Sequence, residues 1–348
     1  MATTLTRRHS SANSGRTTPQ QWRMPWGTAA IGLVMLLGVL LLLYPSTASW
    51  FAQYNQSRVI ENTSARTDEG PPSRLQNELS RAREYNDALA IGESVLSPES
   101  NVPTSQSAAV GGFDYHDLLR ASPDGVMARI RIPAIGVELP IYHGTSDEVL
   151  AKGVGHLEGS SLPVGGTSQH SVLTAHRGLP SAELFNDLHR LTVGDTFTVE
   201  AFGEVLTYRA TQTATILPDE TQSLLPQQGE DLMTLVTCTP LGINTHRYLV
   251  TGERVTPTPI GDVQRAGASP QIPGFPWWAL ALAAAIGAYT AVVIRSGKPK
   301  PTSNARARSR HPGAPRLLGY GASHMDDAFG PDDGDGDGEV SSTAWTQN

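Results

Sequence analysis

The sequence predicts a mainly β fold, a closed barrel or sandwich of about eight strands with short connecting helices, an N-terminal helix and two flanking transmembrane helices. Three observations predict it. Short runs of β-branched and apolar residues, separated by turn residues, fill residues 121–256, which is typical of barrels and sandwiches. One amphipathic helical pattern precedes them. A long apolar run without charge lies near each end of the chain.

The two apolar runs are long enough to span a bilayer. Residues 26–44 and 275–294 contain no charge, and each can cross a hydrocarbon core of ~30 Å as a helix. Tryptophan and tyrosine stand at their ends, where interfacial aromatics belong. A cleaved signal peptide is the alternative for the first run, because small residues follow it at 46–48. That run exceeds the usual apolar length of signal peptides, so we interpret it as a membrane span.

Charge predicts the orientation and limits the partners. Arginines without acids precede the first run, and lysines and arginines follow the second. Positive charge stays inside, so both termini are expected in the cytoplasm and residues 45–274 outside. This outer segment holds 15 Lys/Arg and 26 Asp/Glu, which argues against a nucleic-acid partner. Its one cysteine cannot form an internal disulfide.

Between the first span and the strands, the sequence predicts a helix and then a loop. Ser73, preceded by proline and followed by Gln76, forms a capping box. Apolar residues then recur at spacings of three and four as far as Leu89, which marks an amphipathic helix. Residues 92–112 are too polar and too rich in Pro and Gly for a core element.

The strand region is expected to contain two strands before a short helix and six after it. The predicted strands are residues 126–132, 137–142, 171–175, 196–201, 205–211, 213–217, 232–237 and 248–251. Thr145 with Glu148 predicts a capped helix that ends at Gly153. Ser181 can cap another short helix, with Leu184 and two later leucines facing inward.

The region after the second span is polar. It is basic first and then acidic and glycine-rich. Its aspartates lack the flanking helices and the closing glutamate of an EF-hand. We therefore expect residues 1–25 and 295–348 to be disordered tails, and we expect no metal site.

Cys238 is the only cysteine and stands at the end of a predicted strand. A lone cysteine is often a small buried hydrophobe, but nearby cations favour the reactive thiolate. His246 and Arg247 return on the next strand, and alternation allows only one of them to face Cys238. Because arginine cannot accept a proton, Arg247 would need a separate acid or base, usually a histidine.

At this point the residues resemble a family. TLVTC, followed nine residues later by Arg247 within NTHRYLV, resembles the active-site signature of the sortases, the cysteine transpeptidases of Gram-positive cell surfaces. Three upstream blocks, residues 132–146, 153–166 and 172–185, resemble the class C, pilus-assembling branch. The resemblance covers about residues 122–255 and implies the eight-stranded sortase β-barrel.

The resemblance completes the expected organisation of the chain. The segments are a cytoplasmic tail (1–25), a transmembrane helix (26–44), an extracytoplasmic helix and possible lid (45–120), a catalytic barrel (121–256), a linker (257–274), a transmembrane helix (275–294) and a cytoplasmic tail (295–348).

The resemblance also selects the histidine. The chain has ten histidines, and spacing alone favours none strongly. The histidine of the family motif matches His176 in TAHRGLP. Class C sortases carry a lid that corresponds to residues 92–112, and the nearest counterpart of its plug here is Ser97, Pro98 and Glu99. This triplet lacks the usual leading acid and aromatic ring, so a plain linker is the other interpretation.

The chemistry that the resemblance implies is thiol acyl transfer without a cofactor. Cys238 would attack an LPXTG-like sorting signal of a pilin or surface-protein precursor, His176 would act as general acid and base, and Arg247 would stabilise the oxyanion or hold substrate. A pilin lysine would accept the acyl group. Thr237 and Leu241 would lie near the substrate, and Leu241 stands where the family often has an aromatic residue.

Three other classes compete. A housekeeping-type sortase would anchor proteins to peptidoglycan, but it usually lacks a second span. A papain-like hydrolase would need its cysteine at the start of a helix. A non-enzymatic, membrane-tethered surface scaffold would make Cys238 incidental.

Overall fold

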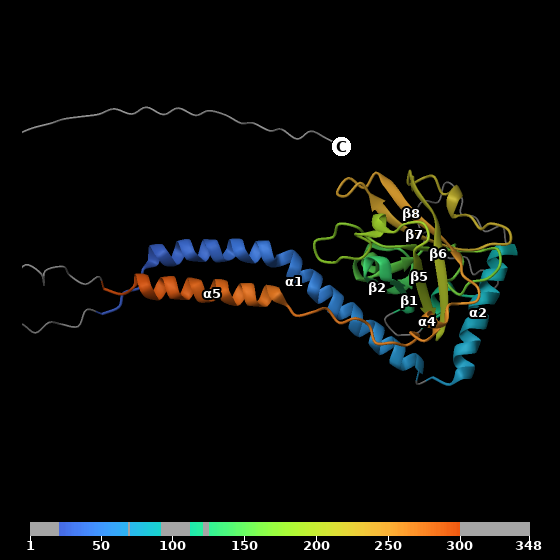
Figure 1. Cartoon of the computed structure of the whole chain (residues 1–348), viewed down its shortest axis with the longest axis horizontal. Coiled ribbons are helices and arrows are strands. Elements are labelled where there is room, and N and C mark those ends of the chain that lie inside the picture. Colours follow the sequence, from blue (N-terminus) through green and yellow to red (C-terminus); the bar gives the residue numbers. More distant parts are fainter. Residues whose placement is uncertain (1–20, 69, 92–111, 121–124, 300–348) are drawn as a thin grey trace, which may run out of the picture. The chain divides into compact units, whose positions relative to one another are not determined.

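The computed structural model describes residues 21–68, 70–91, 112–120 and 125–299 (Figure 1). The lid triplet Ser97, Pro98 and Glu99 and nearly all of both predicted tails lie outside the described residues.

Eight strands close into a barrel in the order β1-β2-β3-β4-β7-β8-β6-β5. The strands are β1 (Val126–Ile132), β2 (Val137–His143), β3 (Val154–His156), β4 (Gln169–Thr174), β5 (Thr196–Ala201), β6 (Glu204–Ile216), β7 (Asp231–Thr239) and β8 (His246–Arg254). The β2–β3 and β4–β7 pairs are parallel, and the other pairs are antiparallel. The predicted eight-stranded barrel is confirmed.

The predicted set of strands contains one split strand and lacks another, and these two errors cancel in the count. Residues 205–211 and 213–217 form one strand, β6, because a bulge between Ala210 and Gln212 lets the pairing with β8 continue. The strand missing from the prediction is β3, which has three residues. A run this short has no periodicity to detect.

The predicted amphipathic helix is α2 (Pro72–Ile91). Its apolar side of Leu79, Ala82, Tyr85 and Leu89 is buried in the same core as the inward-facing residues of the barrel. Asn86 adds two hydrogen bonds to the backbone of Leu162, at 3.0 and 2.7 Å. The helix therefore packs on the barrel.

The predicted helix starts need correction. Ser73 lies inside α2, which begins at Pro72, a residue suited to the first turn because its missing N–H is not needed there. The next helix, α3 (Asp147–Lys152), is capped by Ser146 instead of Thr145, since the Ser146 hydroxyl accepts from the Val149 N–H. After Ser181 there is only a 3₁₀ turn, η3 (Leu188–Arg190).

Two described helices, α1 (Trp26–Asp68) and α5 (Trp277–Ser296), are long and apolar enough to cross a membrane. They run side by side (Figure 1). The Tyr289 ring packs against Gly32, where a Cβ would lie 2.6 Å from the ring. A side chain at position 32 would therefore require the Tyr289 ring to move.

Helix α1 continues well beyond the predicted boundary at residue 44. It has 43 residues and contains Pro45. It bends along its length (Figure 1), and an internal proline is a common cause of such a bend. Its C-terminal half reaches the barrel.

Buried charges hold the segment between the barrel and α5. This linker includes the short helix α4 (Ile260–Val263). Arg129, only 6 % exposed, pairs with Glu200 and Glu138 and donates to Ala268 O at 2.8 Å. Glu138 also accepts from the Gln271 N–H. Each carboxylate thus has a cationic or backbone donor, as burial of charge requires.

Candidate active site

Cys238 is the penultimate residue of β7 and is partly exposed. The β7–β8 register places Arg247 directly opposite Cys238, and His246 opposite Thr239. Directly opposed residues project from the same face of a sheet, and neighbours project from opposite faces. Arg247, and not His246, therefore shares the face of Cys238.

This face is the outer side of the barrel wall. Two residues before Cys238, Val236 packs with Leu249 and Val172 in a small cluster separate from the barrel core. Leu235, on the opposite face, belongs to the core inside the barrel. Strand alternation gives Cys238 the same outward direction as Val236.

His176 reaches the same level from β4. That strand runs parallel to β7 with Thr174 beside Val236, and the Ala175 N–H donates to Val236 O at 3.1 Å. β4 ends at Thr174, and the Ala175 bond extends its pairing by one residue; continuing the same register brings His176 level with Cys238 on the same face. The three predicted residues thus lie on neighbouring chain segments at one edge of the barrel.

No side-chain hydrogen bond joins these three residues to one another in the described part of the chain. Catalytic hydrogen bonds are often long in free enzymes and tighten when substrate binds. The residues are therefore neighbours, as thiol–imidazole chemistry requires, but they form no hydrogen bond with one another before substrate binds.

Arg247 is held by the loop between β7 and β8. Its Nη1 donates to Asn244 O at 3.0 Å and to His246 O at 3.2 Å. No carboxylate among the described residues forms an ion pair with it. A fixed guanidinium whose charge is not neutralised can stabilise negative charge that develops beside it.

Thr237 faces the barrel interior and is fully buried. Its hydroxyl donates to Ala175 O at 2.9 Å, which ties the end of β4 to β7 one step before the His176 and Cys238 level. From this interior position, Thr237 supports the strand ends that carry Cys238 and His176.

Arg177 is a residue of the site that our sequence reasoning missed. Its Nη1 lies 3.4 Å from Thr239 Oγ1, one step beyond the His176 and Cys238 level. With the Thr237 bond on the other side, side chains join β7 to the β4 extension both before and after this level. Strand alternation was the only sequence signal for Arg177. It puts Arg177 on the face opposite to its neighbour His176.

Leu241, in the loop after Cys238, is 59 % exposed. It packs over Gly178, where a Cβ would lie 2.3 Å from Leu241 Cδ1. Gly178 also has a φ of +80°, which favours glycine. The loop after Cys238 and the turn after His176 therefore touch, and an apolar side chain is exposed beside the site.

Three other histidines, His143, His156 and His170, are buried and hydrogen-bonded. Burial lowers the pKa of each of them, and that of His156 to about 4. The His156 ring meets the Tyr115 hydroxyl and Ser161 O, each at 2.9 Å. These hydrogen bonds give the three histidines structural roles.

In the described ranges, no group of three or more His, Cys, Asp or Glu residues could hold a metal ion. The lining of the cavity described below does not include Cys238, His176 or Arg247.

Comparison with known proteins identifies the barrel. A family model described as "Sortase domain" matches residues 130–255. Sortase D of Bacillus subtilis is 34% identical over 131 residues, which are 36% of this chain and 63% of the relative. The match thus spans less than two thirds of that relative.

Solved structures match over a longer stretch. Sortase C1 of Streptococcus agalactiae is 42% identical, with a TM-score of 0.51, over 58% of this chain and 100% of that chain. Sortase C-1 of Streptococcus pneumoniae is 39% identical, also with a TM-score of 0.51 and the same coverage. The chain therefore belongs to the sortase family of cysteine transpeptidases, and its structural neighbours are class C sortases.

Proposed function

We propose that this chain is a membrane-anchored transpeptidase that cleaves LPXTG-like sorting signals and joins pilin subunits through lysine isopeptide bonds. The strand register supports this proposal, because it opposes Cys238 and Arg247 and, continued beyond β4, brings His176 to their level. The Streptococcus pneumoniae sortase C structure, 38% identical to this chain, was described in connection with pilin substrate specificity, which supports a pilin substrate.

In this proposal Cys238 is the nucleophile. Its thiolate, beside a protonated His176, adds to the signal carbonyl and forms the C–S bond. The scissile C–N bond breaks, and the leaving amine takes its proton from His176. Arg247 stabilises the negative oxygen between these two events.

The second half of the reaction reverses the proton transfer. The lysine amine gives its proton to His176, attacks the thioester and forms the isopeptide C–N bond. The C–S bond breaks and regenerates the thiolate. Because water can also attack the thioester, the acceptor decides between transpeptidation and hydrolysis.

The membrane placement belongs to the same proposal. Two helices anchor the chain in the lipid bilayer, the barrel lies on the extracytoplasmic side, and both termini lie in the cytoplasm. The positive charges that precede the first span and follow the second support this orientation.

The test uses the full chain in lipid nanodiscs with an LPXTG peptide and a lysine-bearing pilin peptide. We expect an isopeptide product by mass spectrometry, and a loss of roughly 10³-fold or more in Cys238→Ala. Equal turnover by Cys238→Ala would remove the enzyme hypothesis. A product formed on a peptidoglycan fragment instead of the lysine peptide would favour the housekeeping-type alternative.

A further inference from the structure

The outer half of α1 binds the barrel through polar side chains. Gln53 Nε2 donates to Glu183 Oε2 at 2.8 Å, and Gln56 Nε2 donates to Lys152 O at 3.1 Å. One residue further, Ser57 Oγ donates to Gln271 O at 2.9 Å. The membrane helix is thus attached at three separate points.

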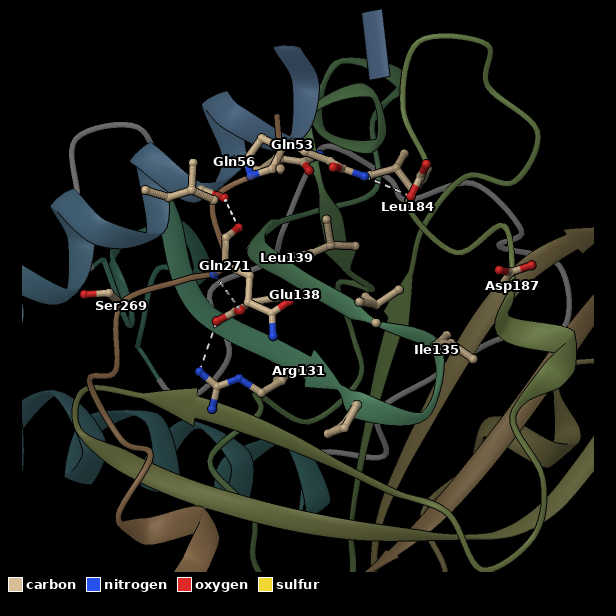
Figure 2. A pocket seen from close by; sticks show the side chains of 18 of the residues that line it. Gln53, Gln56, Arg131, Ile135, Glu138, Leu139, Leu184, Asp187, Ser269 and Gln271 are labelled. Atoms are coloured by element: carbon tan, nitrogen blue, oxygen red, sulfur yellow. Dashed lines mark hydrogen bonds and ion pairs between the residues drawn. The ribbon is translucent and has the colours of Figure 1, made fainter. Parts of the chain in front are cut away.

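Part of the space between these attachments is open. A cavity of about 860 Å³ lies between α1, β2, the linker and the segment around Leu184. Figure 2 shows Gln53 and Gln56 on one side of it and Glu138 and Leu139 on the other. Because side chains do not fill this space, the hydrogen bonds of Gln53 and Gln56 hold α1 across it.

The attachment of Gln53 reaches the segment that holds His176. Glu183 is two residues from Phe185, whose N–H donates to His176 O at 3.1 Å. Next to it, the Asn186 side chain accepts from the Gly178 N–H. These two bonds fix the turn that begins at His176, so a shift of the segment around Glu183 displaces the backbone of His176.

The other two attachments end elsewhere. Gln56 bonds the last residue of α3, and Ser57 bonds the linker before α5. Neither partner hydrogen-bonds to the turn after His176 among the described residues. The chain therefore offers a matched pair of glutamines on one helix, of which only Gln53 is connected to His176.

We infer that Gln53 is a positioning residue, through which the membrane helix α1 holds Glu183 and thereby sets His176 against Cys238. This inference rests on the proposed function of that site. The anchor then contributes to active-site geometry as well as to attachment, and the enzyme is fully active only with α1 in place.

Charge provides a specific test. Gln53→Glu puts two carboxylates where an amide and a carboxylate now meet, and their repulsion moves the segment around Glu183. Adding Glu183→Gln restores one amide and one carboxylate with the partners exchanged. Gln56→Ala removes a hydrogen bond of the same helix without touching this segment, so it is the matched control.

Two measurements on the full chain in nanodiscs are informative. The first is kcat for transpeptidation. The second is the pH profile of alkylation of Cys238 by iodoacetamide, which is specific because the chain has one cysteine. The profile reports the ionisation of the Cys238 thiol beside its imidazole neighbour. A variant that merely lost folded enzyme would react less but would keep the same profile.

We expect Gln53→Glu to lower kcat by about three- to fivefold, because an interaction between exposed side chains is weak. We also expect it to shift the pH profile of alkylation. The exchanged double variant should recover to within about twofold, and Gln56→Ala should keep the native profile. An unchanged kcat and profile in Gln53→Glu, or no recovery in the double variant, would overturn the inference. Failure of the proposed function would instead appear as unchanged turnover in Cys238→Ala.

Discussion

Cys238 on β7 and Arg247 on β8 oppose each other directly across the strand pair. The sulfur and the guanidinium therefore share the outer face of the wall, while the neighbouring His246 faces the other way.

Replacing Arg247 with Ala should lower kcat/KM by roughly 10²- to 10³-fold, since a fixed donor to the developing oxyanion has about this effect in other acyl-transfer enzymes. Peptide turnover under first-order conditions measures it. His246→Ala is the control, because that ring lies on the opposite face, and it should stay within about threefold of the native value. Equal losses in both variants would contradict the assignment of faces.

Arg177→Met should reduce kcat by about tenfold while KM changes little, because the lost contacts with Thr239 and with His189 Nδ1 hold the turn that aligns His176 with Cys238. Adding Thr239→Val should cost little more, since the same contact is already gone. The double-mutant cycle on kcat measures this coupling. Arg190→Met, which removes an exposed arginine paired with Asp187, should leave kcat unchanged. Additive losses for Arg177 and Thr239 would show that they act separately.

Acid should destabilise the fold through His156. Burial lowers its pKa from 6.5 to about 4, so between these pH values the unfolded chain binds a proton that the folded chain does not. The free energy of unfolding therefore falls as the pH falls through this window, by up to about 3 kcal/mol below pH 4. Urea unfolding at pH 7 and pH 5 measures the fall.

His156→Gln should be less stable at pH 7 because it loses buried hydrogen bonds, but its stability should depend less on pH in this window. His189→Gln changes an exposed ring and should keep the native slope. A native slope in His156→Gln would assign the acid sensitivity to other groups.

Gly178→Ala and Gly242→Ala form a matched pair, since the two glycines have φ values of +80° and +78°. Both variants should lose about 1 kcal/mol of stability from the left-handed backbone. Only at Gly178 does the new Cβ collide with Leu241, whose exposed side chain can turn away. We therefore expect a higher KM for the sorting peptide in Gly178→Ala alone, and equal KM values would separate Leu241 from substrate binding.

Much of the fold could be predicted from local patterns. The strand β1 and the hairpin of β5 and β6 follow from alternation and turn residues, and the membrane helices follow from apolar length. The C-terminal part of α1 could not be predicted, because the residues beyond 44 are mostly polar and Pro45 predicts a break. They remain helical where Gln56, Ser57 and Ile60 are buried.

The site was predictable only in part. Cys238 and Arg247 follow from one motif and the alternation of strands. His176 needed the family resemblance, since ten histidines offered no local distinction. Arg177 and Gln53 contact partners 62 and 130 residues away along the chain. Such contacts depend on the closed barrel and on the course of α1, and no sequence spacing encodes them.

The outward direction of Cys238 has a consequence for cargo. A thioester formed on the exterior of a barrel carries its acyl chain directly into solvent, and no lumen limits the size of what is attached. Under the proposed function, large and already folded proteins could therefore be coupled one after another, provided that each presents a short extended tail to the sulfur.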